Sequence, residues 1–114
     1  MLWMYTTEGR KDFSPKEIKI EEKELDFICD MGCNFIRLPI DYRFFVQDFN
    51  YGNSNEKMLK VLDSCVESII SRGLHCSLNI HRAPGYCING AETEKHNLWK
   101  DKEAEDEFSR LWKD

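Results

Sequence analysis

Segments with helical and strand-like apolar patterns alternate along this chain, and that order limits the folds it can adopt. The periodicity predicts helices over residues 14–31 and 55–73 and a third helix after Asp101, with short strands over residues 34–40 and 74–81. Alternation of this kind with short connections is typical of right-handed βαβ units in a parallel sheet. The sequence therefore predicts the α/β class and leaves a doubly wound sheet and a closed barrel as alternatives.

The ends of the expected helices carry recognisable signals. Ser14-Pro15-Lys16-Glu17 combines a capping hydroxyl, a proline at the first helical position and a glutamate three residues after the cap, which is a capping-box start. Gly32 and Gly73 are stop signals for the first two helices, and Asp101 is the expected N-cap of the third. Residues 34–40 are largely apolar, so we expect this strand to be buried on both faces.

Two observations favour a closed barrel over a doubly wound sheet. Neither strand is followed by the glycine-rich phosphate loop that marks nucleotide-binding doubly wound sheets. The long connections that follow the strands are rich in aromatic residues, and a barrel keeps its active site at the carboxyl ends of its strands.

Charge and apolar content exclude two classes of partner. The chain has 16 Lys+Arg and 21 Asp+Glu, a formal charge of −5, and no run of basic residues longer than two, so it lacks the positive surface that binds phosphates. No apolar run is long enough to span a membrane. We therefore expect no nucleic acid and no membrane among the partners.

The five cysteines are interpreted as reduced thiols. Their number is odd and no signal-peptide pattern precedes them, which favours a cytoplasmic location, with export as the alternative if the natural chain begins before Met1. Cys29 and Cys33 have no second Cys or His pair at zinc-binding spacing, and no Cys-x-x-Cys pair is present. We expect no metal and no cofactor.

Two polar residues on the expected strands are candidate site residues. Arg37 lies inside an otherwise apolar strand, and a buried guanidinium without a partner costs several kcal/mol, so we expect it to meet an anion. Residues 34–40 contain no acid, so the anion comes from elsewhere in the fold, as in an ion pair at the rim of the sheet, or from a ligand. His81 ends the second strand and faces the expected site, whereas His75 starts that strand and His96 lies in a polar loop.

Aromatic residues gather in the connections after both strands. They are Tyr42, Phe44, Phe45, Phe49 and Tyr51 after the first strand, and Tyr86 and Trp99 after the second. Exposed rings suit stacking on the apolar faces of sugars, although we expect at least half of these rings to serve packing. Tyr42 and Tyr86 are the candidates for ligand contact. Glu92 and Glu94, in the second connection, are expected to be solvated charges.

Several stretches together form a family-like pattern. Residues 34–40 read Asn-Phe-Ile-Arg-Leu-Pro-Ile after Glu24-Leu25-Asp26-Phe27-Ile28 and Gly32, and residues 78–86 read Leu-Asn-Ile-His-Arg-Ala-Pro-Gly-Tyr. With residues 98–101 and 108–112, these stretches resemble family 5 of the glycoside hydrolases, the cellulase family, over about residues 20–112. The His-Arg-Ala-Pro-Gly stretch is quite specific.

The resemblance implies a (β/α)8 barrel and retaining hydrolysis of O-glycosidic bonds in β-glucan or a related oligosaccharide substrate. It implies that Arg37 hydrogen-bonds the nucleophilic glutamate and keeps it ionised, and that His81 lines the subsite where the sugar is cleaved. Both residues are then supporting residues, together with Tyr42 and Tyr86. Cellulose, mixed-linkage glucan, mannan and β-glucosides remain alternatives for the substrate.

The chain is shorter than such a barrel, which needs roughly 250 residues. The resemblance places the acid/base glutamate at the end of the fourth strand and the nucleophile at the end of the seventh, so we expect both beyond Asp114 and no catalytic residue within the chain. Residues 1–114 are interpreted as the N-terminal part of one incomplete barrel domain, from the first strand and helix to the third helix, with Met1–Tyr5 as a remnant of the first strand. This part alone is expected to be inactive.

Two further hypotheses follow from an incomplete barrel. The chain is alternatively a shortened barrel that acts as a non-catalytic carbohydrate-binding module. Open parallel-strand edges also favour self-association of the incomplete barrel.

Overall fold

The computed structural model describes residues 20–46, 50–88 and 94–114. Its elements are α1 (Glu22–Asp30), β1 (Phe35–Asp41), the short 3₁₀ helix η2 (Tyr42–Phe44), α2 (Glu56–Ile70), β2 (His75–Arg82) and α3 (Lys102–Leu111). This order confirms the predicted alternation and the α/β class. Predictions for Met1–Tyr5, Ser14–Glu17, Phe49 and Glu92 lie outside the described residues.

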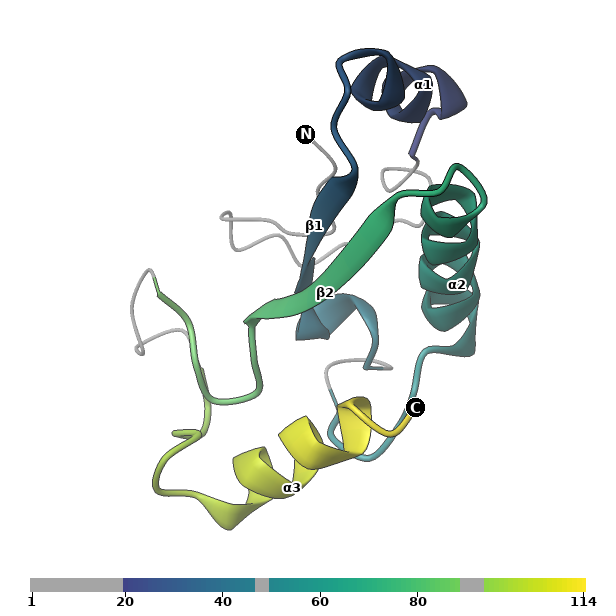
Figure 1. Ribbon diagram of the computed structural model, residues 1–114. Helices are drawn as coiled ribbons and strands as arrows, with labels where there is room; N and C mark the ends of the chain where they lie inside the picture. Colours follow the sequence, from purple (N-terminus) through teal and green to yellow (C-terminus); the bar gives the residue numbers. More distant parts are fainter. Residues whose placement is uncertain (1–19, 47–49, 89–93) are drawn as a thin grey trace.

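β1 and β2 lie side by side as a parallel pair at the centre of the molecule (Figure 1). Phe35 lies opposite His75 and Ile40 opposite Ile80, and an irregularity after Ile40 brings Asp41 opposite Arg82. Parallel strands end at the same edge of a sheet. The connections that follow β1 and β2 therefore start from neighbouring positions.

α2 covers one face of this strand pair. Side chains alternate between the two faces along a strand, and the even-numbered residues of β1 point toward α2. The shared core contains Ile36, Leu38 and Ile40 of β1, Leu62, Cys65 and Ile69 of α2, and Leu74 at the start of β2. The spacing of three and four residues along α2 places its apolar side chains on one stripe, which explains this packing.

The prediction that β1 is buried on both faces is confirmed for its second half, where Pro39 and Asp41 are buried on the odd-numbered face, and wrong for its first half. Phe35 is 55% exposed and Arg37 is also exposed, whereas Ile36 and Leu38 between them are buried. The short apolar run has the composition of a doubly buried strand, but in the described part of the chain α2 covers only the face of the even-numbered residues. The opposite face carries Phe35 and Arg37 into solvent.

The first helix is shorter than predicted. Ile20 and Glu21 are not helical, and α1 begins at Glu22 with a capping box formed by Glu21 and Glu24. The prediction of a continuous helix up to Met31 that includes Ile20 and Glu21 is therefore wrong, and the predicted start at Ser14 lies outside the described residues. The predicted end is confirmed, because Met31 is the C-cap and Gly32 follows it with a φ of +77°.

The other two helices begin where the capping signals predict. Asn55 caps α2, with its side chain accepting a hydrogen bond from the Met58 backbone N–H at 3.3 Å. Asp101 occupies the N-cap position of α3, but its carboxylate accepts instead from the backbone N–H of Asn97 at 2.7 Å. This bond ties the loop before α3 to the start of the helix.

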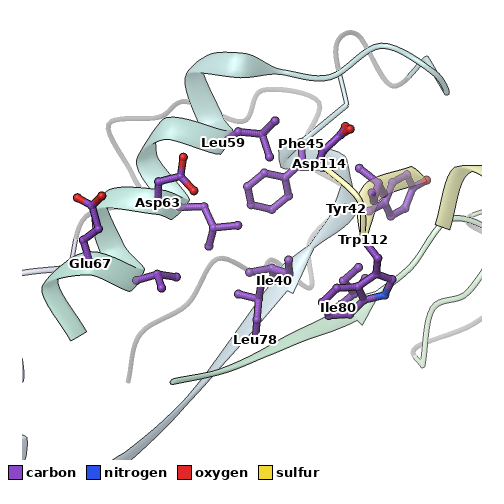
Figure 2. A pocket seen from close by; sticks show the side chains of 13 residues that line it. Ile40, Tyr42, Phe45, Leu59, Asp63, Glu67, Leu78, Ile80, Trp112 and Asp114 are labelled. Carbon is purple, nitrogen blue, oxygen red and sulfur yellow. The ribbon is translucent and has the colours of Figure 1, made fainter. Parts of the chain in front are cut away.

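A cavity of about 390 Å³ lies between the strand pair, α2 and the end of α3 (Figure 2). Apolar side chains dominate its lining, which comprises Ile40, Tyr42, Phe45, Leu59, Leu62, Val66, Leu78, Ile80, Leu111 and Trp112 with the carboxylates Asp63, Glu67 and Asp114. Ile40, Leu78 and Ile80 reach it from the α2 side of the strands. The cavity is thus on the face opposite to Arg37.

Within residues 20–46, 50–88 and 94–114, no helix is long and apolar enough to cross a membrane, and no three His, Cys, Asp or Glu side chains are grouped to hold a metal ion. The five thiols are free. Cys65 of α2 is buried in the hydrophobic core, and this burial raises the pKa of its thiol.

Candidate functional site

Arg37, Asn79 and His81 form a polar cluster on the strand face that points away from α2. The Arg37 Nη2 atom donates to Asn79 Oδ1 at 2.6 Å and lies 3.3 Å from His81 Nδ1. Asn79 and His81 are two residues apart on β2, so both point to the same face. The parallel pairing places Arg37 beside Ser77 on that face, which brings its long side chain within reach of both.

The expectation that Arg37 is buried is wrong, because its side chain is exposed on the open face of β1. A solvated guanidinium does not need a carboxylate to offset the cost of burial. In the described part of the chain, no carboxylate forms an ion pair with Arg37, which contacts the amide of Asn79 and the imidazole of His81. The guanidinium therefore keeps its positive charge without local compensation.

The residues that follow β1 contain a buried ion pair. Asp41 is fully buried, and its carboxylate accepts from Arg43 Nε at 2.9 Å, from Arg43 Nη2 at 2.6 Å and from the Arg43 backbone N–H at 3.0 Å. Burial opposes the charge of the guanidinium, but the hydrogen bond and the charge of Asp41 outweigh it and raise the pKa of Arg43. This pair fixes the turn that leaves β1.

A second buried pair joins the connections that follow the two strands. Arg82 Nε donates to Glu94 Oε1 at 2.6 Å, and the two side chains are only 7% and 2% exposed. The Tyr42 hydroxyl donates to the other carboxylate oxygen of Glu94 at 2.7 Å. Glu94 therefore holds both loops together, and the prediction that it is a solvated charge is wrong.

The sequence distance between Glu94 and its partners explains that error. A glutamate in a polar loop is usually solvated, and only the folded chain brings it to Arg82, 12 residues away, and to Tyr42, 52 residues away. The burial of Tyr42, followed by its bond to Glu94, raises the pKa of the Tyr42 hydroxyl far above its ordinary value. Tyr42 is therefore a neutral donor inside the protein.

The aromatic residues divide into packed and exposed groups. Tyr42, Phe44 and Phe45 are buried, as expected for rings that serve packing. Tyr86 is 41% exposed and Trp99 is 79% exposed. Of the two tyrosines predicted to contact ligand, Tyr86 thus presents a surface and Tyr42 bonds to Glu94 inside the fold.

A backbone hydrogen bond joins the two segments that carry Tyr86 and Trp99. The Leu98 N–H, one residue before Trp99, donates to the Gly85 carbonyl, one residue before Tyr86, at 3.0 Å. Gly85 has a φ of +72°, and a Cβ atom there would lie 2.5 Å from the Leu98 nitrogen. Glycine is therefore required at this position for both conformation and space.

The remaining histidines lie apart from the cluster. His75 starts β2 at the opposite end of the strand from His81. The His96 ring lies 5.4 Å from that of Tyr51, and its Nδ1 lies 3.9 Å from an Asp101 carboxylate oxygen. This separation agrees with the choice of His81 as the candidate.

Known proteins share the sequence pattern of this chain. The family model described as cellulase, glycosyl hydrolase family 5, matches residues 5–114. The chain belongs to glycoside hydrolase family 5.

The curated relatives match most of this chain but a small part of their own length. The chain is 32% identical to Endoglucanase C of Acetivibrio thermocellus over 94 residues, which cover 82% of this chain and 27% of that enzyme. Cellodextrinase A of Ruminococcus flavefaciens is 30% identical over 83% of this chain and 27% of its own length. A β-xylosidase of Phanerodontia chrysosporium is 30% identical over 77% of this chain and 19% of its own length.

A solved structure matches the fold of almost the whole chain and also extends well beyond it. The crystal structure of a glycoside hydrolase superposes with a TM-score of 0.84 and 42% identity, covering 98% of this chain and 33% of that one. This family 5 chain therefore has the fold of about one third of a glycoside hydrolase.

Proposed function

We propose that the protein to which this chain belongs hydrolyses O-glycosidic bonds of β-linked glucans by a retaining mechanism with two glutamates. In this proposal residues 1–114 form the N-terminal part of a (β/α)8 barrel, and both glutamates lie beyond Asp114. The names endoglucanase and cellodextrinase of the relatives support a β-glucan substrate.

The observation that carries the proposal is the exposed Arg37 guanidinium beside Asn79 and His81. Arg37 is the third residue of β1, and its side chain reaches Asn79 and His81 in the second half of β2, on the strand face that a closed barrel turns inward. A cation there would hold a neighbouring carboxylate in its ionised form. A retaining glycosidase needs its nucleophile in that form, about 5 Å from the acid/base residue.

His81 and Tyr86 have supporting roles in this proposal. His81 lies near the end of β2 with one ring nitrogen beside Arg37, on the strand face where this proposal places the sugar. Tyr86 follows within the loop at the same end and exposes its ring. Tyr42 would act through the Glu94 contact that positions the loop.

The decisive experiment is to translate the reading frame beyond Asp114 and to express the whole product. An Asn-Glu pair within about 30 residues after Asp114, and release of reducing sugars from soluble β-glucan by the product, support the proposal. Arg37→Lys in that product should lower kcat, because a lysine cannot reproduce the planar arginine contacts. A product that leaves β-glucan and related oligosaccharides intact would contradict the proposal.

The 114-residue chain provides a second test. We expect no hydrolysis by this chain alone, since the proposal places both glutamates outside it. If hydrolytic activity copurifies with the chain and is lost when the chain is removed from the sample, the reacting carboxylates are inside residues 1–114.

The exposed pair Tyr86 and Trp99 favours sugar binding as a second candidate function of the isolated chain. Affinity electrophoresis in β-glucan should retard the folded chain, and Trp99→Ala should remove that retardation because stacking on the indole is lost. Trp112→Ala is the matched control, since Trp112 is also exposed but lines the cavity beside α2. Equal migration with and without glucan would rule out the binding module.

A further inference from the structure

Asn79 makes the shorter of the two contacts to Arg37 in the polar cluster. Its Oδ1 accepts from Arg37 Nη2 at 2.6 Å, across the two strands. Both residues lie on regular, paired parts of β1 and β2, where the backbone is held by the sheet. The contact is thus built on rigid elements and does not depend on a loop.

An amide at this position differs chemically from a carboxylate. It offers a strong acceptor to the guanidinium but carries no charge, so the positive charge of Arg37 remains available to an anion. An aspartate in its place would neutralise Arg37 and compete with any other carboxylate. Asn79 therefore orients Arg37 without satisfying its charge.

The Arg37 contact also constrains His81. A guanidinium has only donors, so His81 Nδ1, at 3.3 Å from Arg37 Nη2, must act as an acceptor. The proton of the neutral ring is then on Nε2. His81 consequently presents an N–H donor at the atom that does not face Arg37.

We propose that Asn79 is a positioning residue that orients the Arg37 guanidinium and, through it, the Nε2–H form of His81. The juxtaposition places the Arg37 guanidinium and the Nε2–H form of His81 side by side on the strand face that points away from α2. This inference rests on the proposed function only in assigning these donors to a carboxylate and to a sugar hydroxyl. The geometry itself is independent of hydrolysis.

Nitrogen NMR of the 114-residue chain tests the geometry without substrate. In the folded chain we expect two separate Nη resonances for Arg37, because its contacts slow rotation of the guanidinium, and an unprotonated Nδ1 for His81 above pH 8. Arg37→Lys and His81→Gln identify the signals. One averaged Nη resonance, a protonated Nδ1, or a spectrum identical to that in urea would overturn the proposal.

Three variants separate positioning from general structure. Asn79→Leu should merge the two Nη resonances of Arg37. In the separate variant Asn79→Asp the two resonances should stay distinct, because aspartate keeps the acceptor oxygen. Ser77→Ala, on the same face of β2, should leave them unchanged. If Ser77→Ala merges the resonances as Asn79→Leu does, Asn79 has no specific role. If Asn79→Leu does not fold, Asn79→Ser removes the acceptor from reach and should merge them equally.

A kinetic measurement on the whole product distinguishes this inference from the proposed function. In an active hydrolase, Asn79→Leu should lower kcat about tenfold with little change in KM, and Asn79→Asp should lower kcat at least as much because its charge competes for Arg37. An active enzyme with unchanged kcat in both variants would overturn the role of Asn79. Its β-glucanase activity would still support the proposed function.

Discussion

At the scale of single residues, two arginines on the paired strands have different surroundings. Arg82 and Glu94 pair within the fold with almost no exposure, whereas Arg37 is exposed and, within the described residues, contacts Asn79 and His81 without a carboxylate. The first arrangement suits a structural link between loops. The second leaves a charge available for a partner outside the described residues.

The buried pair leads to a prediction about stability. Glu94→Gln removes the carboxylate charge that pairs with the buried Arg82, so the free energy of unfolding should fall by about 3 kcal/mol. Urea denaturation followed by circular dichroism measures the change. Asp106→Asn is the control, because the Lys102–Asp106 pair is exposed, and its urea midpoint should not move. Equal midpoints for Glu94→Gln and the unmodified chain would show that the pair is solvated.

Tyr42 predicts a dependence of stability on alkaline pH. Its pKa is raised in the folded chain by burial and by Glu94, whereas in the unfolded chain it titrates near pH 10. Above pH 10 the folded state therefore holds more protons than the unfolded state, and the contribution of Tyr42, complete below about pH 9, is lost as pH rises. Tyr42→Phe should remove about 1.4 kcal/mol of the loss in unfolding free energy between pH 9 and pH 11. Urea titrations of both chains at the two pH values check this, and parallel losses would contradict it.

At the scale of elements, the stripe along α2 decides which residues support the fold. Ile69 is fully buried in the core, whereas its neighbour Ile70 is 59% exposed. Ile69→Ala should lower the free energy of unfolding by about 2–5 kcal/mol or abolish the cooperative transition, while Ile70→Ala should change it little. Denaturation of the two variants provides the comparison. Similar losses for both would mean that α2 packs through a different face.

Elements were predictable where the signal is local. The periodicity of α2, the asparagine that caps it and the alternation along β2 all lie within a few residues of one another. The start of α1 was mispredicted because the capping pattern at Ser14 competes with a second one at Glu21 and Glu24. The exposure of Phe35 and Arg37 in β1 was mispredicted because it depends on which elements cover each face of the strand.

The candidate site was predictable in part for the same reason. Arg37 and His81 stand out because a charge inside an apolar strand and a histidine at a strand end are visible in sequence. Asn79 has an equivalent signal, since it alternates in phase with His81 along β2, but only the parallel register brings Arg37 to it. Glu94 has no such signal.

At the scale of the whole molecule, exposed apolar side chains predict association of the isolated chain. Phe27 and Met31 lie one helical turn apart at α1 and are 63% and 65% exposed. Sedimentation velocity should show oligomers that grow with concentration, and changing both residues to lysine should reduce them. Ile88→Lys, in the loop after β2, is the control and should have little effect. A chain that stays monomeric at every concentration would contradict the prediction.

The amino-acid sequence by itself determined the order of helices and strands, the α/β class and the resemblance to family 5, because these depend on local periodicity and on short contiguous motifs. The tertiary structure alone decided which strand face is covered, that Glu94 is buried, and that Arg37 meets Asn79 and His81 rather than a carboxylate. These features depend on contacts between residues that are far apart along the chain. Their energies follow from burial and charge, which exist only after the strands are paired and the loops are in place.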